Sequence, residues 1–245
     1  MSKHLKIAAI SLILLGLAAR IAVVCAGGPS PHYAENINTD EINYLELASN
    51  IADSKCYGAW SEGFYTQSTR SPGYPAFLAF FNLFYGKGHP WLPQILNILL
   101  ESLNIILVYL VGRTIYGNRT GLAAALLYSF LGACFIYVKF ATSEIFSVTL
   151  LLTTCFYLAG LKSHYRYSIA GFVIAFACLI HTKPAFLLVL PFAALCIYAG
   201  IPYEKMKSRL LKSAIPVLII ALLCIPWTVR NYRVHKTVVP VCTFA

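Results

Sequence analysis

The chain has 245 residues, of which 59% are apolar and 11% are charged. Soluble globular domains contain about 45–50% apolar and about 25% charged residues, so this composition excludes an ordinary soluble enzyme, a disordered chain and a coiled coil. It is typical of an all-α membrane protein. The formal net charge is +10, but the basic residues are spread between apolar runs and no basic stretch carries interleaved aromatic residues. This pattern favours membrane orientation and contact with anionic lipid head groups, and no nucleic-acid partner is expected.

Seven apolar runs approach the roughly 20 residues that a helix needs to cross the bilayer core. They cover residues 5–26, 91–111, 120–138, 145–161, 168–180, 185–199 and 213–228. The first run is too long for a signal peptide and is expected to stay as a span. The fifth and sixth runs are short, and Pro184 between them is expected to break the helix into two helices that meet in a turn. We therefore expect about seven transmembrane helices.

Residues 27–90, between the first two runs, form a long polar segment that holds six of the nine acidic residues. Within it, Asp40–Ala52 has apolar residues at helical spacing, and Pro75–Tyr85 is an aromatic apolar stretch too short to span. Both are expected to be helices that lie on the membrane surface.

The distribution of charge predicts which side each loop faces. If the N-terminus is inside, the inner segments hold a single acidic residue, Glu204. Their basic residues are Lys3, Lys6, Arg113, Arg119, Lys162, Arg166, Lys205, Lys207, Arg209 and Lys212. Short inner loops rich in Lys and Arg follow the positive-inside rule, so residues 27–90 are expected outside.

Charged residues at the expected outer ends of the helices are candidates for chemistry. Asp40 and Glu41 stand at a helix start, where carboxylates either complement the helix dipole or supply acidic chemistry. Arg70 precedes a stiff Pro-Gly-Tyr-Pro turn, and its guanidinium is suited either to a lipid-linked phosphate or to head groups. Lys183 and Arg230 run against the positive-inside tendency and therefore indicate an anionic partner on that side.

Ionisable residues inside a bilayer are costly and usually face a cavity or a partner. Arg20 lies near the outer end of the first run, where it is expected to reach the Asp40 region. Glu101 has Asn97 and Asn104 at helical spacing, which predicts a polar stripe packed inside the bundle. His181 has no second His or Cys at ligand spacing, which favours a polar interfacial role over a metal site.

Five short motifs follow one another along the chain. They are Asp40-Glu41-x-x-Tyr44, Arg70-x-Pro72-Gly73-Tyr74-Pro75, Ser143-Glu144, Lys183-Pro184 and Pro226-Trp227-x-x-Arg230-Asn231-Tyr232. This ordered set resembles the bacterial membrane-integral GT-C glycosyltransferases, which include protein O-mannosyltransferases, lipid A aminoarabinose transferases and lipopolysaccharide-core transferases. The resemblance implies that residues 1–245 are the N-terminal transmembrane domain of a longer enzyme. It also implies that residues 27–90 are a first periplasmic loop with the catalytic motif, in a multi-pass protein of the bacterial inner membrane with a cytoplasmic N-terminus.

The function implied by the resemblance is transfer of a sugar from a polyprenyl-phosphate donor to a lipid, glycan or protein acceptor at the outer face. Asp40 and Glu144 are implied as the catalytic carboxylates, with Glu144 across the same cavity from Asp40. The implied substrate-binding residues are Glu41, Tyr44, Arg70, Tyr74, Lys183 and Arg230. No metal ligands are predicted, although a divalent cation is an open alternative.

Two other functions use some of the same features. A polyprenyl-phosphate-sugar flippase needs polar residues in a bundle and basic contacts to phosphate, but it does not need a long acidic outer loop. Transporters often show internal repeats in hydropathy, and the chain shows none. The third function is that of a non-catalytic membrane partner.

Overall fold

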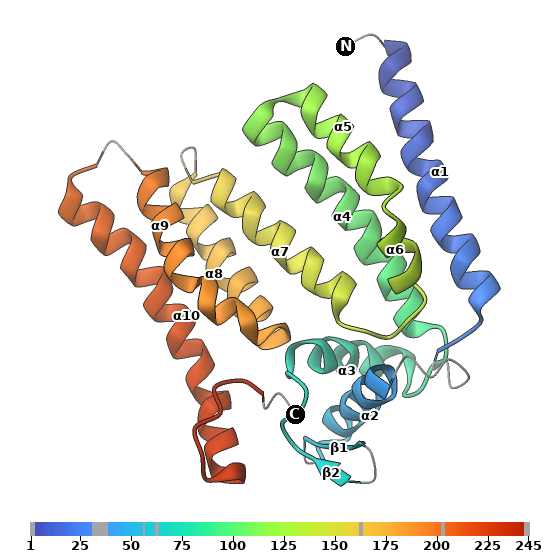
Figure 1. Ribbon diagram of the computed structural model, residues 1–245, viewed down its shortest axis with the longest axis vertical. Helices are drawn as coiled ribbons and strands as arrows, with labels where there is room; N and C mark the ends of the chain where they lie inside the picture. Colours follow the sequence, from blue (N-terminus) through green and yellow to red (C-terminus); the bar gives the residue numbers. More distant parts are fainter. Residues whose placement is uncertain are drawn as a thin grey trace.

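The computed structural model describes residues 3–30, 39–55, 57–61, 64–161, 164–201 and 204–242. The elements in chain order are α1 (Lys3–Gly27), α2 (Thr39–Ala52), β1 (Ala59–Ser61), β2 (Phe64–Thr66), α3 (Gly73–Tyr85), α4 (Leu92–Tyr116), α5 (Asn118–Ser129), α6 (Gly132–Tyr137), α7 (Glu144–Ala159), α8 (Tyr165–Thr182), η1 (Pro184–Val189), α9 (Leu190–Gly200) and α10 (Met206–His235). The long helices run side by side, and α2, α3 and the β1–β2 hairpin cover one end of them (Figure 1).

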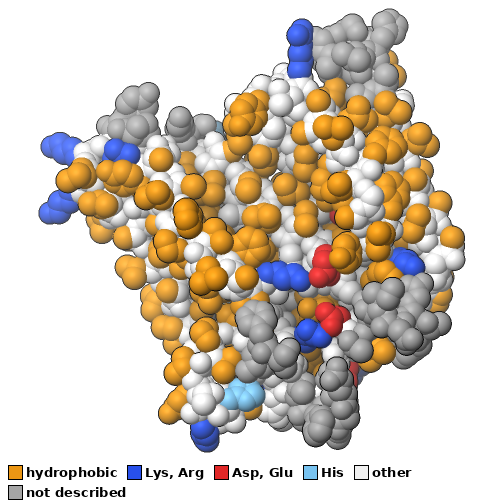
Figure 2. All heavy atoms as spheres, viewed as in Figure 1, with side chains coloured by type: hydrophobic (Ala, Val, Ile, Leu, Met, Phe, Trp, Pro, Cys, Tyr) orange, Lys and Arg blue, Asp and Glu red, His pale blue; other side chains and the backbone are white. Residues whose placement is uncertain are grey.

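The prediction of an all-α membrane protein is confirmed. Four helices, α1, α4, α8 and α10, are long and apolar enough to cross a membrane, and α7 and the η1–α9 segment are shorter apolar helices. Apolar side chains cover most of the face shown in Figure 2, as expected for helices in contact with lipid. The count of seven spans stays a prediction.

The third apolar run is divided, which differs from the single helix expected over residues 120–138. Helix α5 ends at Ser129, the chain is extended at Leu131, and the short helix α6 follows. The expected break between the fifth and sixth runs is confirmed: α8 ends at Thr182, and Pro184 starts η1. Proline lacks a backbone N–H, so it begins a helix readily but cannot continue one.

Both helices predicted in residues 27–90 are present as α2 and α3, close to the predicted bounds. They pack together and onto the start of α4 through a cluster that includes Tyr44, Tyr74, Leu78 and Leu96. On its other side α3 exposes Phe80, Leu83 and Phe84, as expected of a helix that lies on a membrane surface. The β1–β2 hairpin, in which Ala59 pairs with Thr66, was not predicted.

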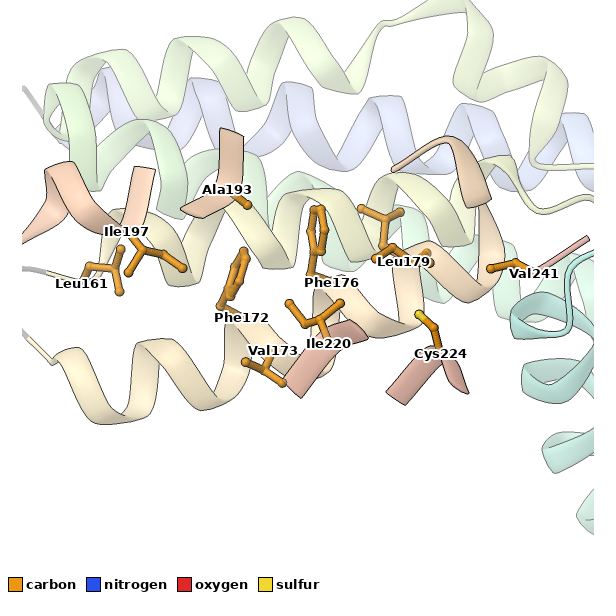
Figure 3. Packing of buried hydrophobic residues seen from close by; sticks show 11 residues of the cluster. Leu161, Phe172, Val173, Phe176, Leu179, Ala193, Ile197, Ile220, Cys224 and Val241 are labelled. Atoms are coloured by element: carbon orange, nitrogen blue, oxygen red, sulfur yellow. The ribbon is translucent and has the colours of Figure 1, made fainter. Parts of the chain in front are cut away.

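The largest described apolar cluster surrounds α8. Phe172, Phe176 and Leu179 of α8 meet Ile197 of α9 and Ile220 of α10 (Figure 3). The Phe172 and Phe176 rings stack with their centroids 5.4 Å apart. This cluster joins α8 to α9 and α10.

A buried ion pair joins α1 to α4. Arg20 Nε lies 3.3 Å from Glu101 Oε2, and both side chains are buried. Arg20 also donates to the carbonyls of Ser129 (2.6 Å) and Tyr128 (3.1 Å), while the Tyr128 hydroxyl donates to Glu101 (3.0 Å). The expectation that Arg20 reaches the Asp40 region is therefore wrong.

The close approach of α1 and α5 explains the difference. A Cβ on Gly16 would lie 2.6 Å from the Ser129 carbonyl oxygen, so only glycine allows α1 to come so near. Carbonyls in the last turn of a helix lack donors from within that helix, and the Arg20 guanidinium donates to those of Ser129 and Tyr128. The predicted polar stripe is confirmed, because Asn97, Glu101 and Asn104 are all buried.

Arg20→Ala is expected to lower the free energy of unfolding by about 3–5 kcal/mol, because it leaves the Glu101 carboxylate buried without its cation. Denaturant titration of the purified protein in micelles measures this loss. In the double variant Arg20→Met/Glu101→Leu no charge is left unpaired, so it should lose less stability than Arg20→Ala. A double variant less stable than the single one would contradict this description of the pair.

Candidate active site

Two ion pairs lie at the end of the bundle that α2 and α3 cover. Arg70 Nη2 donates to Asp40 Oδ1, and Lys183 Nζ donates to Glu144 Oε1 at 3.0 Å. The side chains are 45% exposed for Asp40, 30% for Arg70 and 36% for both members of the other pair. Acidic and basic side chains meet at two neighbouring places on the face in Figure 2. Unlike Arg20 and Glu101, these four side chains are accessible to a ligand.

The ends of helices position these charges. Asp40 lies in the first turn of α2 and Glu144 is the first residue of α7, where the helix dipole favours a carboxylate. Lys183 directly follows α8, where the dipole favours a cation. Arg70 lies in the segment that leads into α3, and the Tyr57 hydroxyl donates to its backbone carbonyl at 2.9 Å.

Tyr44 of α2 connects the two pairs. Its hydroxyl lies 3.2 Å from the Ser143 hydroxyl, next to Glu144, and the Arg70 guanidinium lies 6.0 Å from its ring centroid. Asp40, Arg70 and Lys183 are all within electrostatic reach of its phenol. Burial raises the pKa of Tyr44, so the phenol stays neutral at physiological pH and keeps its proton for hydrogen bonding.

Tyr74 of α3 packs against Tyr44 of α2. The two rings meet edge to face with their centroids 5.2 Å apart. Burial raises the pKa of Tyr74 well above its ordinary value, and Glu144 and Glu41 add to this by their charge. Among the described residues its hydroxyl has no hydrogen-bond partner. The predicted site residues Asp40, Tyr44, Arg70, Tyr74, Glu144 and Lys183 therefore form one group.

Glu144 stands just before the apolar part of α7. Burial by itself raises the pKa of this carboxyl, but the neighbouring Thr142 hydroxyl and the charge of Lys183 outweigh burial and lower the pKa. Glu144 is therefore ionised at neutral pH and is available as an acceptor of protons or hydrogen bonds.

Two of the predicted substrate-binding residues lie apart from this group. Glu41 is fully buried and accepts hydrogen bonds from the Ser30 hydroxyl and from the Ala141 backbone N–H (2.9 Å). Successive residues of a helix point in directions about 100° apart, so Glu41 faces inward where Asp40 faces the accessible side. Its contacts join α2 to the segment before α7.

Arg230, near the end of α10, binds the loop around the hairpin. It donates to the Gln67 carbonyl (2.7 Å), the Ser68 hydroxyl (2.8 Å) and the Tyr57 carbonyl (2.8 Å). The Tyr57 and Trp227 rings meet edge to face beside it, 4.9 Å apart. Tyr57 was not predicted, because a single tyrosine in a polar loop has no spacing that marks it.

Gly73 explains why Arg70 and Lys183 lie at the same end of the helix bundle. A Cβ on Gly73 would lie 2.8 Å from the His181 carbonyl oxygen and would also overlap the Thr182 hydroxyl. Glycine therefore allows α3 to start in direct contact with the last turn of α8. The His181 ring lies against its own helix, with Nδ1 2.8 Å from the Ala177 carbonyl oxygen.

Gly73→Ala is expected to push α3 away from α8 and to cost about 1–3 kcal/mol of stability, the usual range for an overpacked contact. Thermal unfolding measures this cost. The matched control is Gly132→Ala, because a Cβ there meets nothing within 4 Å. Equal melting temperatures for the two variants would show that the contact of α3 with α8 is not tight.

Comparisons with known proteins give a family and a fold for the chain. Residues 69–229 match the model of a family described as dolichyl-phosphate-mannose-protein mannosyltransferase. The matched range contains Arg70, Tyr74, Glu144 and Lys183, whereas Asp40 and Tyr44 precede it. A comparison with curated proteins gave no match.

Solved structures of the Archaeoglobus fulgidus oligosaccharyltransferase have a similar fold. The apo form is 15% identical, with a TM-score of 0.66 over 93% of this chain and 30% of that protein. The form tethered to an acceptor peptide with the NVT sequon is also 15% identical, with a TM-score of 0.64 over 90% of this chain and 30% of that protein. The chain therefore spans about 30% of the length of the structures it matches. Because the family model covers about two thirds of the chain, the chain belongs to the dolichyl-phosphate-mannose-protein mannosyltransferase family, and the resemblance to GT-C glycosyltransferases is confirmed.

Proposed function

We propose that this chain is the membrane domain of a glycosyltransferase that moves a sugar from a polyprenyl-phosphate donor to an acceptor hydroxyl at the outer face. One observation carries the proposal: two accessible carboxylate–cation pairs, from four separate segments, flank Tyr44. Such a transfer needs a proton acceptor for the attacking hydroxyl and positive charge for the leaving phosphate. The family description, which names a lipid-phosphate sugar, supports the same class of donor.

The cations Arg70 and Lys183 are assigned to the donor phosphate. Arg70 offers a planar fork of N–H donors, which suits two phosphate oxygens, and Lys183 offers a compact positive charge. Both now bind carboxylates at accessible positions, so an arriving phosphate competes with Asp40 and Glu144 for them. The negative charge that develops on the leaving phosphate strengthens these contacts in the transition state.

The carboxylates are assigned to the acceptor. Its oxygen forms a bond to the anomeric carbon while the bond from that carbon to the phosphate oxygen breaks, and the electron pair leaves with the phosphate. The hydroxyl proton passes to Asp40, the more exposed of the two carboxylates. Glu144 orients the acceptor from the other side of Tyr44. Glu41 is given no part in the chemistry, because its side chain is fully buried.

A divalent cation is still an open alternative. Asp40 and Glu144 already bind Arg70 and Lys183. The described residues contain no cluster of three or more His, Cys, Asp or Glu side chains suited to a metal ion. The proposed steps use no metal ion.

Asp40→Asn is expected to lower the rate of sugar transfer by about 10²–10⁴-fold, because asparagine cannot accept the proton. Binding of the donor should persist, since Arg70 and Lys183 remain. Transfer from a radiolabelled polyprenyl-phosphate sugar by the purified protein in vesicles measures the rate. The matched control is Glu204→Gln, which removes another partly exposed carboxylate that pairs with a basic side chain, Lys212.

Wild-type turnover in Asp40→Asn would remove Asp40 from the mechanism. A parallel loss in Glu144→Gln alone would transfer the role of base to Glu144. Movement of the lipid across the vesicle membrane without transfer of sugar would support a flippase instead.

Arg70→Ala is expected to weaken binding of the polyprenyl-phosphate donor more than Arg70→Lys does, because lysine keeps the charge and loses only the fork. The fold should survive both changes, since Tyr57 binds the backbone of Arg70 and not its side chain. Equilibrium binding of the donor in micelles checks the order, with Arg166→Ala on α8 as the control. Equal affinity in all variants would reduce Arg70 to an anchor for head groups.

A further inference from the structure

A cavity of about 870 Å³ lies between α1, α4 and α5. Its apolar wall includes Ile10 of α1, Ile106 of α4 and Leu122 of α5. Ile10 is 54% exposed and Ile106 is 53% exposed, so the cavity opens on the apolar outer surface of the helices. An apolar chain entering from the bilayer can therefore reach it.

The cavity lies at the opposite end of the bundle from the two ion pairs. Helix α4 begins at Leu92, beside α2 and α3, and ends at Tyr116, which lines the cavity (Figure 1). Its 25 residues span about 37 Å at about 1.5 Å per residue, slightly more than the roughly 30 Å of a bilayer core. The end of the cavity at Tyr116, which we call its mouth, is therefore level with the lipid head groups on the side of the bilayer opposite to the two ion pairs.

Two arginines stand at this mouth. Arg113 in the last turn of α4 and Arg119 in the first turn of α5 both line the cavity and are exposed. Within the described part of the chain, neither forms an ion pair with an acidic side chain. The sequence has no Asp or Glu between Glu101 and Glu144. Among the described residues, no carboxylate therefore balances these two cations at the mouth of the apolar cavity.

The spacing of the two arginines is set by direct contact between backbones. A Cβ on Gly112 would lie 2.9 Å from Gly121 Cα, and a Cβ on Gly121 would lie 2.6 Å from the Tyr109 carbonyl oxygen. The end of α4 and the start of α5, on either side of the turn at Gly117, are therefore in direct contact. The site is therefore already formed before a ligand binds, so less binding free energy is lost to ordering the protein.

We propose that this cavity binds an anionic phospholipid, with its phosphate between Arg113 and Arg119 and an acyl chain along Ile10 and Ile106. A free phosphate ion would leave the apolar wall in contact with water. A zwitterionic lipid would bring an ammonium group to two guanidinium groups that repel it. An anionic lipid satisfies both the charge and the apolar wall, and its recognition does not depend on the proposed sugar transfer.

Binding of phosphatidylglycerol to the purified protein in a neutral detergent, measured by native mass spectrometry, tests the proposal. The double variant Arg113→Gln/Arg119→Gln should raise the dissociation constant about 25-fold, since each cation near the head groups contributes about fivefold. The control Arg166→Gln removes an exposed arginine of α8 that does not line the cavity and should leave the constant unchanged. Ile106→Trp should also weaken binding, because it fills the cavity without changing the charge.

Phosphatidylcholine and inorganic phosphate are expected to bind the wild type more weakly than phosphatidylglycerol. Equal loss in the double variant and in Arg166→Gln would overturn the site, because it would show only a general attraction of the basic surface. Phosphate that binds as tightly as the lipid would overturn the choice of a lipid. If the double variant does not fold, Arg119→Gln alone serves, with an expected loss of about fivefold.

Discussion

The contact between Gly73 and the last turn of α8 determines where the charged side chains of the site meet. Because α3 starts against the end of α8, Arg70 lies just before one helix and Lys183 just after the other, at the same place. The hydrogen bond between Tyr44 and Ser143 holds α2 and the segment before α7 together beside these two cations. A side chain at position 73 would separate the elements that carry the two cations.

The ion pairs of the chain differ in burial, and burial decides what each pair can do. Arg20 and Glu101 are fully buried and surrounded by carbonyl and hydroxyl partners, so they hold α1, α4 and α5 together and offer nothing to a ligand. The pairs Asp40–Arg70 and Glu144–Lys183 are partly open to solvent. Partly exposed pairs contribute little to stability. A ligand can therefore replace the carboxylate in such a pair with little loss of folding free energy. The proposed binding of phosphate uses this difference.

Much of the fold follows from short-range patterns in the sequence. Run length and composition predicted α1, α4 and α10, helical spacing predicted α2, and the restriction of proline predicted the break after α8. The polar stripe of α4 was predicted because residues three and four apart share one face of a helix.

What the sequence did not show depends on contacts between distant segments. The partner of Arg20 lies 81 positions away on α4, and only the close approach of α1 and α5 at Gly16 brings the charges together. Asp40 and Glu41 are neighbours in one motif, yet one faces solvent and the other the interior. The division of the third run after Ser129 leaves carbonyls for Arg20, and nothing in its apolar composition marks that point.

In the proposed reaction, the donor phosphate takes Arg70 and Lys183 from their carboxylates. A cryo-electron microscopy structure of the protein with bound polyprenyl phosphate tests it most directly. Phosphate oxygens are expected within about 3 Å of both cations, the usual length of a charge-assisted hydrogen bond, with Asp40 and Glu144 released from them. A phosphate bound elsewhere, with both ion pairs intact, would contradict it.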